Sequence, residues 1–298
     1  MYLGAANCIS FQDSFLADAP WASLKEINEE SKLLGPNYKQ YVKPAAIRRM
    51  STVLKMGAAG GSECLKQAGF QKTDAIIVGS GLGCVRDTLR FLKAVYEEDE
   101  NTLSPTAFIQ STHNSIAGQL ALMLGNHNYN MTHVQGNLSL AYALSDAELL
   151  INEGDAETVL VGGVDEKTEE LTELLSGLAN TANYSLPRIG EGAAFFMASK
   201  QKLNSSVARM EKLEMTAPSS VDADLILTNA PGKFDRAFNY IPFSGEHFTS
   251  VGFGLYLGMK ALEKGSIDCS DLKVAEVKSV LVHHGLFGQE TSITLEKV

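Results

Sequence analysis

The chain has 298 residues, of which 45% are apolar and 20% are charged, an ordinary composition for a globular protein with a large core. Its formal net charge of −10 argues against nucleic-acid binding, which depends on Lys and Arg side chains that neutralise phosphates. We also expect no membrane span, because no stretch approaches the roughly 18 consecutive apolar residues that a spanning helix needs.

The cysteines give a second indication about the cellular setting. There are four of them, and they follow neither the spacing of a disulfide framework nor that of a zinc site: Cys8, Cys64, Cys84 and Cys269. This pattern predicts reduced thiols in a cytoplasmic protein. We expect no metal site and no cofactor.

Continuous apolar runs bounded by glycine predict strands that are buried on both faces of a sheet. These runs cover residues 75–78, 159–161, 194–197, 225–227 and 280–282. Helical patterns lie between them, at about residues 47–68, 115–124, 138–152 and 250–263. The alternation predicts an α/β fold with mostly parallel or mixed sheets that are covered by helices.

The segment 130–166 is the most informative part of the sequence. It predicts a strand, a sharp turn at Gln135, Gly136 and Asn137, a helix that is apolar on nearly all sides, and a second strand. The unpaired N–H groups and the dipole at the start of a helix stabilise an anionic nucleophile or an oxyanion. A reactive thiol would suit this position, but the nearest cysteines, Cys84 and Cys269, are far away in the sequence.

A weak internal repeat predicts two similar halves. His133, an apolar helix, a glycine and two strands are followed by a second series of the same kind that begins near His247. We expect the halves to cover residues 1–203 and 204–298, with the second half shortened. Because each buried helix must be covered on all sides, the halves should form one fused globular unit.

Five short motifs together resemble the β-ketoacyl synthase branch of the thiolase-like superfamily, and more narrowly its synthase-like and chain-length-factor members. They occur in family order along most of the chain, at residues 78–83, 114–120, 154–163, 190–194 and 285–288. The resemblance implies a thiolase-like, layered αβαβα fold that is built from two pseudo-repeated halves with mixed sheets.

The same resemblance implies that the catalytic residues of the family are lost. Its nucleophilic Cys falls on Asn137, and the segment around Asn229 lacks the first of the family's paired histidines, whereas His247 is a candidate for the second. Claisen condensation needs covalent acyl transfer and stabilisation of an oxyanion. We therefore expect a vestigial site, made of Gln135, Gly136, Asn137, Asn229 and His247.

The resemblance also points to residues that would line an acyl tunnel. Thr112 and His113 occupy the place where synthases limit the length of the acyl chain, and Leu286 and Phe287 lie in the glycine-rich loop near the end. We expect these four residues to bind substrate. An ordinary core or interface histidine is an equally good interpretation of His113.

From these features we expect a non-catalytic, chain-length-factor-type subunit that pairs with an active ketoacyl synthase in fatty-acid, aryl-polyene or polyketide-like biosynthesis. The strand near residues 129–133 would pair across the dimer interface, and acyl carrier protein would bind through the synthase subunit. Two alternatives remain: an acyltransferase or malonyl-ACP decarboxylase of the same family, and a homodimeric acyl-binding protein.

Three further groups of polar residues have simpler structural explanations. Ser139, in the first turn of its helix, is expected to cap or pack rather than to attack substrate. The adjacent residues His283 and His284 should point to opposite faces of a strand, which argues against a shared metal. Asp165 and Glu166 end a strand, so we expect a polar contact there, with acid–base chemistry as the minor alternative.

Overall fold

The computed structural model describes residues 1–18, 20–97, 103–181, 188–269 and 272–298. Its centre is a ten-stranded mixed sheet. One half of the sheet contains, in spatial order, β3 (Tyr129–His133), β2 (Ala75–Gly79), β4 (Thr158–Asp165), β5 (Gly192–Ser199) and β1 (Tyr2–Ile9). The other half continues with β6 (Ser206–Glu214), β12 (Gln289–Lys297), β11 (Ser279–Leu286), β7 (Leu225–Thr228) and β8 (Phe238–Asn239).

The strand order is mirrored about the pair formed by β1 and β6. In the first half β2 runs parallel to β3 and β4, and in the second half β7 runs parallel to β8 and β11. The remaining neighbours within each half, and the central pair β1 and β6, are antiparallel. Two α/β halves of common origin would produce such an order, although a boundary at residue 203 stays a prediction.

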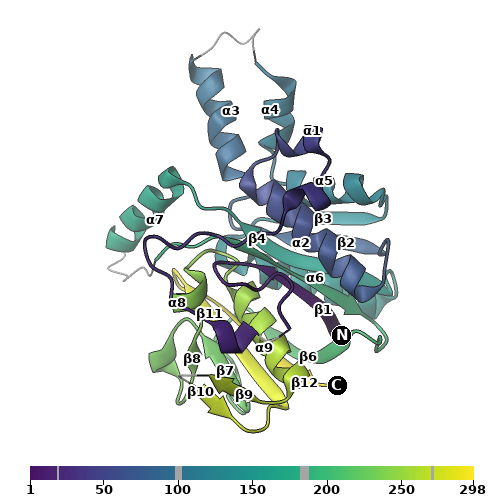
Figure 1. Cartoon of the computed structure of the whole chain (residues 1–298), viewed down its shortest axis with the longest axis vertical. Helices are drawn as coiled ribbons and strands as arrows, with labels where there is room; N and C mark the ends of the chain where they lie inside the picture. Colours follow the sequence, from purple (N-terminus) through teal and green to yellow (C-terminus); the bar gives the residue numbers. More distant parts are fainter. Residues whose placement is uncertain (19, 98–102, 182–187, 270–271) are drawn as a thin grey trace.

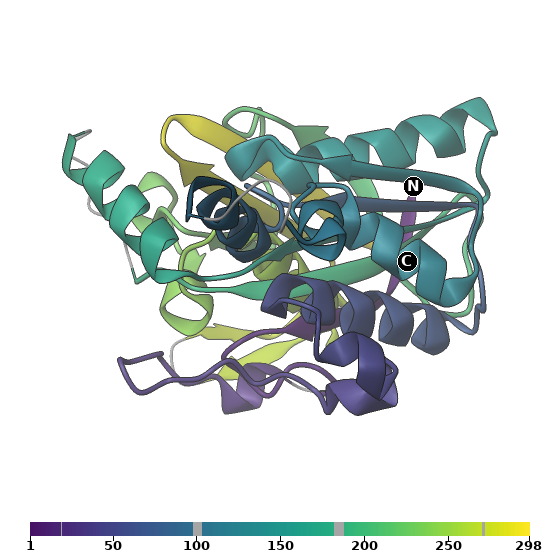
Figure 2. The ribbon, with the colours of Figure 1, turned by 90° about the horizontal axis from the view of Figure 1, so that it is seen from above.

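Helices cover the sheet in layers. On one face lie α6 (Ser139–Glu153) and α9 (Val251–Lys264), whose apolar residues join both halves of the sheet in one core cluster. The opposite face of the first half is covered by α2 (Thr52–Ala68) and α5 (Ser115–Leu124), which belong to a second cluster. Figure 2 shows α6 and α2 on opposite sides of the first-half strands. The expected α/β class, with helices that cover a large mixed sheet, is confirmed.

The second half of the chain is less completely covered. In its described part, the connections from β6 to β7 and from β7 to β8 contain no α-helix, only the 3-10 turn η5 (Pro231–Lys233). The central strand β6 instead carries charged residues on its exposed face, and Arg209 pairs with Glu296 of β12 at 3.3 Å. Antiparallel sheets tolerate one solvated face of this kind, which explains how the shortened half remains stable.

Three helices project from the layered body, and the sequence patterns did not predict them. Figure 1 shows α3 (Val85–Glu97) and α4 (Pro105–Gln110) extending beyond the sheet, and α7 (Glu169–Thr181) extending at its side. The long helix expected over residues 47–68 is divided into α1 (Pro44–Ile47) and α2, because Ser51 is extended (φ −65°, ψ 173°). Within the described part of the chain, no helix has both the length and the apolar character to cross a bilayer.

The remaining elements are short. They are the 3-10 turns η1 (Pro20–Ser23), η2 (Tyr38–Gln40) and η4 (Gly136–Leu138), the helix α8 (Ile241–Ser244), and a separate ribbon formed by β9 (Ile267–Cys269) and β10 (Leu272–Val274).

Candidate functional site

The predicted site residues lie at the carboxyl ends of the parallel strands. The turn η4 follows β3, Asp165 ends β4, and Asn229 follows β7 beside the end of β11. In α/β sheets this edge is the usual place for ligands, because strand ends and helix starts meet there. The fold therefore places both halves of the predicted site where a ligand site is expected.

The turn at residues 135–137 is closely packed and directly precedes α6. Gly136 adopts a positive φ of 56°, which favours glycine. Asn137 is only 1% exposed, and its Nδ2 donates to the backbone carbonyl of Gln289 at 3.0 Å. Its Oδ1 is buried without a hydrogen-bond partner. The position therefore holds a neutral amide that can donate hydrogen bonds but cannot form a thioester.

Ser139 supports the turn and is not free to react. Its Oγ donates to the carbonyls of Ser80 and Gly136 at 2.9 and 2.7 Å, and it accepts the backbone N–H of Gln135 at 2.8 Å. Gln135 itself is exposed. Ser139 therefore fixes the turn by packing and hydrogen bonding, as one of the two roles predicted from the sequence, and does not cap an N–H group of α6.

Asp165 joins the two halves at the site. One of its carboxylate oxygens accepts the backbone N–H of Gly81 at 2.7 Å, and the other accepts both the N–H and the hydroxyl of Thr249, at 2.8 and 2.7 Å. His247 lies beside it, with Nδ1 3.6 Å from the same oxygen. A carboxylate with this many donors is a structural anchor, as expected for a polar contact at the end of a strand.

Glu166, the next residue, is also buried and caps two helices. Its carboxylate accepts the backbone N–H groups of Val53 and Arg86, which belong to the first turns of α2 and α3, at 3.4 and 3.0 Å. Burial raises the pKa of Glu166, and the two N–H groups and the charge of Arg86 partly oppose that rise. The pair at the end of β4 thus holds helix starts in place.

Asn229 belongs to a buried network that the sequence did not reveal. Its Nδ2 donates to Glu246 at 3.1 Å and to the carbonyl of Gly285 at 2.7 Å. Glu246 also lies 3.1 Å from Nε2 of His284, whose Nδ1 contacts the hydroxyl of Tyr240 at 2.7 Å. Although burial alone would raise the pKa of Glu246, the nearby His284 and the hydrogen bonds from Asn229 and Ser250 lower it.

The hairpin between β11 and β12 brings these parts together. The backbone of Gly285 accepts a hydrogen bond from the side-chain amide of Asn229 and donates another to it. The carbonyl of Gln289 accepts a hydrogen bond from Asn137. Phe248 lies against Gly81, where an added Cβ would overlap its ring. Phe248 and Phe287 also pack against a small cluster formed by Leu171 and Leu175 of α7 and by Ile189. Among the predicted site residues, Asn137 and Asn229 therefore both bind the hairpin between β11 and β12, whereas His247 is close to Asp165.

The four residues predicted to bind substrate belong to two different segments of the chain, just before α5 and at the end of β11. Leu286 is 2% exposed, and Phe287 has a positive φ of 48°. Thr112 donates to the carbonyl of Ile109 at 2.9 Å and contacts the hydroxyl of Ser115, whereas His113 is exposed in the isolated chain. Their role in an acyl tunnel stays a prediction.

Sequence reasoning missed Glu246, Phe248 and Gln289. A Glu between Gly245 and His247, ahead of an uncharged helix, was the available signal for a buried carboxylate. For Gln289 the sequence contains no such signal, because the hydrogen bond to Asn137 is made by its backbone carbonyl and not by its side chain. Across the described residues, no group of three or more His, Cys, Asp and Glu side chains is arranged to hold a metal ion.

Comparison with known proteins identifies the family. A family model described as "Beta-ketoacyl synthase, N-terminal domain" matches residues 20–221, about two thirds of the chain. The chain belongs to the β-ketoacyl synthase family. Two curated members are similar in part: the 3-oxoacyl-[acyl-carrier-protein] synthase 2 of Vibrio cholerae is 24% identical over 143 residues, and that of Vibrio harveyi is 24% identical over 138 residues.

These sequence matches are partial. They cover 46% and 44% of this chain, but only 34% and 33% of the two Vibrio proteins, so the chain spans about a third of the length of those synthases. The similarity to the two Vibrio proteins agrees with the family model, which by itself matches two thirds of the chain.

The solved structures that resemble this chain confirm the expected thiolase-like fold of β-ketoacyl synthases. The ishigamide ketosynthase/chain length factor superimposes with a TM-score of 0.74 and 14% identity, and covers 100% of this chain and 99% of that one. The ketosynthase ApeO in complex with its chain length factor ApeC, from Xenorhabdus doucetiae, gives 0.62 and 14%, with full coverage of both chains.

Proposed function

We propose that this chain is a non-catalytic, chain-length-factor-type subunit that pairs with an active ketoacyl synthase in the biosynthesis of fatty-acid, aryl-polyene or polyketide-like chains. The observation that supports it best is the buried amide of Asn137, which is hydrogen-bonded to Gln289 at the start of α6. A helix start of this kind activates a thiol in acyl-transfer enzymes. An amide at the same position cannot carry an acyl group.

The surface around β3 supports the pairing. This strand forms one edge of the sheet, and its side chains are largely exposed, including Tyr129 and Met131 at 40% each. Leu122 of the neighbouring α5 is 75% exposed. Proteins usually cover or pair an exposed sheet edge. A partner synthase that adds its own strand here would bury these side chains in an interface of about 2,000–5,000 Å², the size of obligate interfaces.

One of the similar structures is described as a ketosynthase in complex with its chain length factor, and another as a type II PKS acyl-carrier protein in complex with its ketosynthase. By analogy, we infer that acyl carrier protein reaches this chain through the synthase subunit, in the cytoplasm. The vestigial residues Gln135, Gly136, Asn137, Asn229 and His247 would then maintain the shape of the site without performing chemistry.

Co-expression with an active, Cys-containing ketoacyl synthase from the same organism tests the proposal. We expect a stable complex of one copy of each, and full-length products only when both are present. A monomer that never binds the synthase would contradict the proposal. A stable homodimer that binds acyl ligands without the synthase would instead support the homodimeric alternative.

A further inference from the structure

A cavity of about 580 Å³ lies outside the site described above, among the helices at the far end of the first half of the sheet. It is bounded by the junction of α1 and α2 and by α3 and α4, and Figure 1 shows α1, α3 and α4 at this end of the molecule. Three arginines line it, Arg48, Arg49 and Arg90, and none of its described lining residues is acidic. Its volume falls within the roughly 300–1,000 Å³ that is typical of small-molecule sites.

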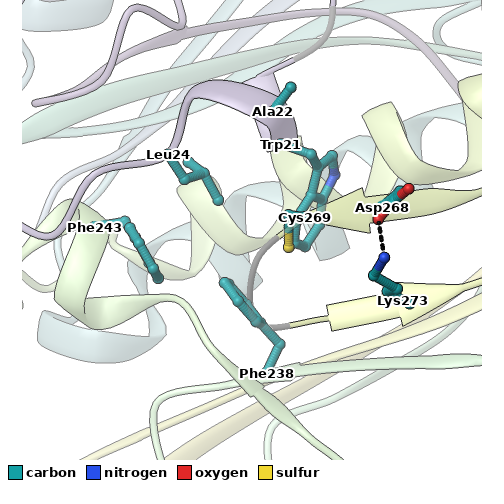
Figure 3. A pocket seen from close by; sticks show the side chains of 8 residues that line it. All are labelled: Trp21, Ala22, Leu24, Phe238, Phe243, Asp268, Cys269 and Lys273. Carbon is teal, nitrogen blue, oxygen red and sulfur yellow. Dashed lines mark ion pairs between the residues drawn. The ribbon is translucent and has the colours of Figure 1, made fainter.

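The positive charge of this cavity is unbalanced, although the chain as a whole has a net charge of −10. Arg48 and Arg49 are exposed, and neither side chain forms an ion pair or a hydrogen bond with the described residues. The cavity beside β9 and β10 is different, because its Lys273 is already paired with Asp268 at 3.1 Å (Figure 3). Unpaired positive charges that line a concave surface attract anions.

The wall that contains the third arginine is held in place. The Nη2 of Arg90 donates to Asp87 at 3.0 Å and to Gln110 of α4 at 3.3 Å. The rings of Phe91 and Phe108 pack against each other between α3 and α4, with centroids 5.5 Å apart. These contacts fix α3 against α4. The cavity therefore exists before a ligand arrives, which lowers the entropy cost of binding.

We propose that this cavity binds a small organic phosphate monoester. The three arginine charges, less the one negative charge of Asp87, leave a charge of +2 around the cavity. A phosphate monoester carries about −1.5 to −2 at pH 7 and neutralises this charge, whereas a carboxylate carries only one negative charge. The planar guanidinium also presents paired N–H donors that match the spacing of phosphate oxygens.

The remaining lining residues suit the rest of such a ligand. Thr106 and Ser104 supply hydroxyl groups, and the Oγ of Ser104 accepts the backbone N–H of Ala107, which leaves its proton free to donate. Phe91 and Ala94 provide an apolar surface for the organic group. The site is separate from the turn at residues 135–137, and the proposal does not depend on pairing with a synthase.

Calorimetric titration of the full chain tests this proposal. The probe is phenyl phosphate, and benzoate, which has the same ring but a single negative charge, is the comparison. We expect one phenyl phosphate to bind per chain, at least about tenfold more tightly than benzoate, a difference of about 1.4 kcal/mol. Inorganic phosphate should bind more weakly than phenyl phosphate, because it makes no contact with Phe91. Vesicles that contain phosphatidic acid should not compete with the probe.

Variants of the two unpaired arginines test the location. Arg48→Gln and Arg49→Gln should each weaken the binding of phenyl phosphate by at least about tenfold, and should fold normally because both side chains are exposed. Lys273→Gln is the matched control: it removes the same charge from the other cavity (Figure 3) and should bind the probe as the original chain does.

Four results would overturn the proposal. Phenyl phosphate would fail to bind, or benzoate or inorganic phosphate would bind as tightly as the probe. Lys273→Gln would weaken binding as much as Arg48→Gln and Arg49→Gln, which would reveal a general effect of net charge. Both arginine variants would bind as the original chain does. Phosphatidic acid vesicles would displace the probe, which would assign the cavity to a membrane lipid instead of a small phosphate ester.

Discussion

The side-chain amide of Asn137 donates a 3.0 Å hydrogen bond to the backbone carbonyl of Gln289, a residue 152 positions away. The bond ties the start of α6 to β12, and so connects the two halves of the molecule at the predicted site. Asn137 is 1% exposed, and its part-buried hydrogen bond to Gln289 contributes to the stability of the fold. Asn137, which we predicted to occupy the position of the family's nucleophile, thus has a structural role.

This role predicts that Asn137→Ala will destabilise the protein. Removing the amide leaves the part-buried carbonyl of Gln289 without this donor, so we expect the free energy of unfolding to fall by about 0.5–1.5 kcal/mol. Urea unfolding measures the change. The neighbouring Gln135→Ala, at an exposed position, is the control and should alter stability by less than about 0.5 kcal/mol. Equal effects from both variants would exclude the proposed tie.

The buried pair of Glu246 and His284 predicts a dependence on pH. The pKa of Glu246 is lowered in the folded protein, so its contribution to stability is present above the pKa of an unfolded Glu and is lost as the pH falls through the folded value. Glu246→Gln should lower the free energy of unfolding by about 3 kcal/mol at pH 7. It should also make stability less sensitive to acid.

Thermal unfolding of the original chain and of Glu246→Gln, each followed from neutral to acidic pH, measures this difference. Glu153→Gln, at an exposed position at the end of α6, is the control and should leave the acid sensitivity unchanged. If the acid sensitivity of the two variants is the same, the buried pair is not its source.

The exposed edge strand β3 predicts how association can be blocked. Met131→Lys places a charge in the middle of the strand, a device that natural edges use against pairing. We expect the affinity for the partner synthase to fall by at least about tenfold, equivalent to about 1.4 kcal/mol, with folding unchanged. Light scattering and circular dichroism provide the two measurements. Leu174→Lys, at a 54% exposed position on α7, should bind normally, and failure of both variants to weaken binding would place the interface elsewhere.

The fold class could be predicted from sequence because its strands carry continuous apolar runs that are buried on both faces, as in β2 and β4. The sequence patterns did not predict β6 and α3, for a physical reason. Along β6, charged residues such as Arg209 and Glu211 alternate with apolar ones, and on α3 only Asp87 is buried. Neither element shows the buried pattern on which the prediction relied.

The candidate site was predicted only in part. A glycine turn before an apolar helix marks Asn137, because the local sequence determines that geometry. The partners of Asn137 and Asn229 could not be predicted, since Gln289 and Gly285 contribute backbone atoms, which every residue has. The role of Glu246 depends on contacts with residues distant in the chain, Asn229 and His284, which local sequence patterns do not reveal.

The proposed acyl tunnel predicts a change in product length. Thr112 and His113 lie just before α5, and a larger side chain in a closed tunnel excludes extra methylenes by overlap, at a cost of roughly 1–3 kcal/mol. Thr112→Trp should shorten the products of the reconstituted pair, and His113→Ala should lengthen them or broaden their distribution. Mass spectrometry of the released chains is the measurement. An unchanged profile for both variants in an intact complex would remove these residues from the tunnel.

The most direct test of the central claim is the intact mass of both subunits after the reconstituted pair has been incubated with acyl-loaded carrier protein. Because Asn137 cannot form a thioester, we predict that the acyl mass appears on the synthase alone, while this chain keeps its original mass. The synthase serves as the internal positive control. A stoichiometric acyl adduct on this chain that maps to residues 132–139 would contradict the account.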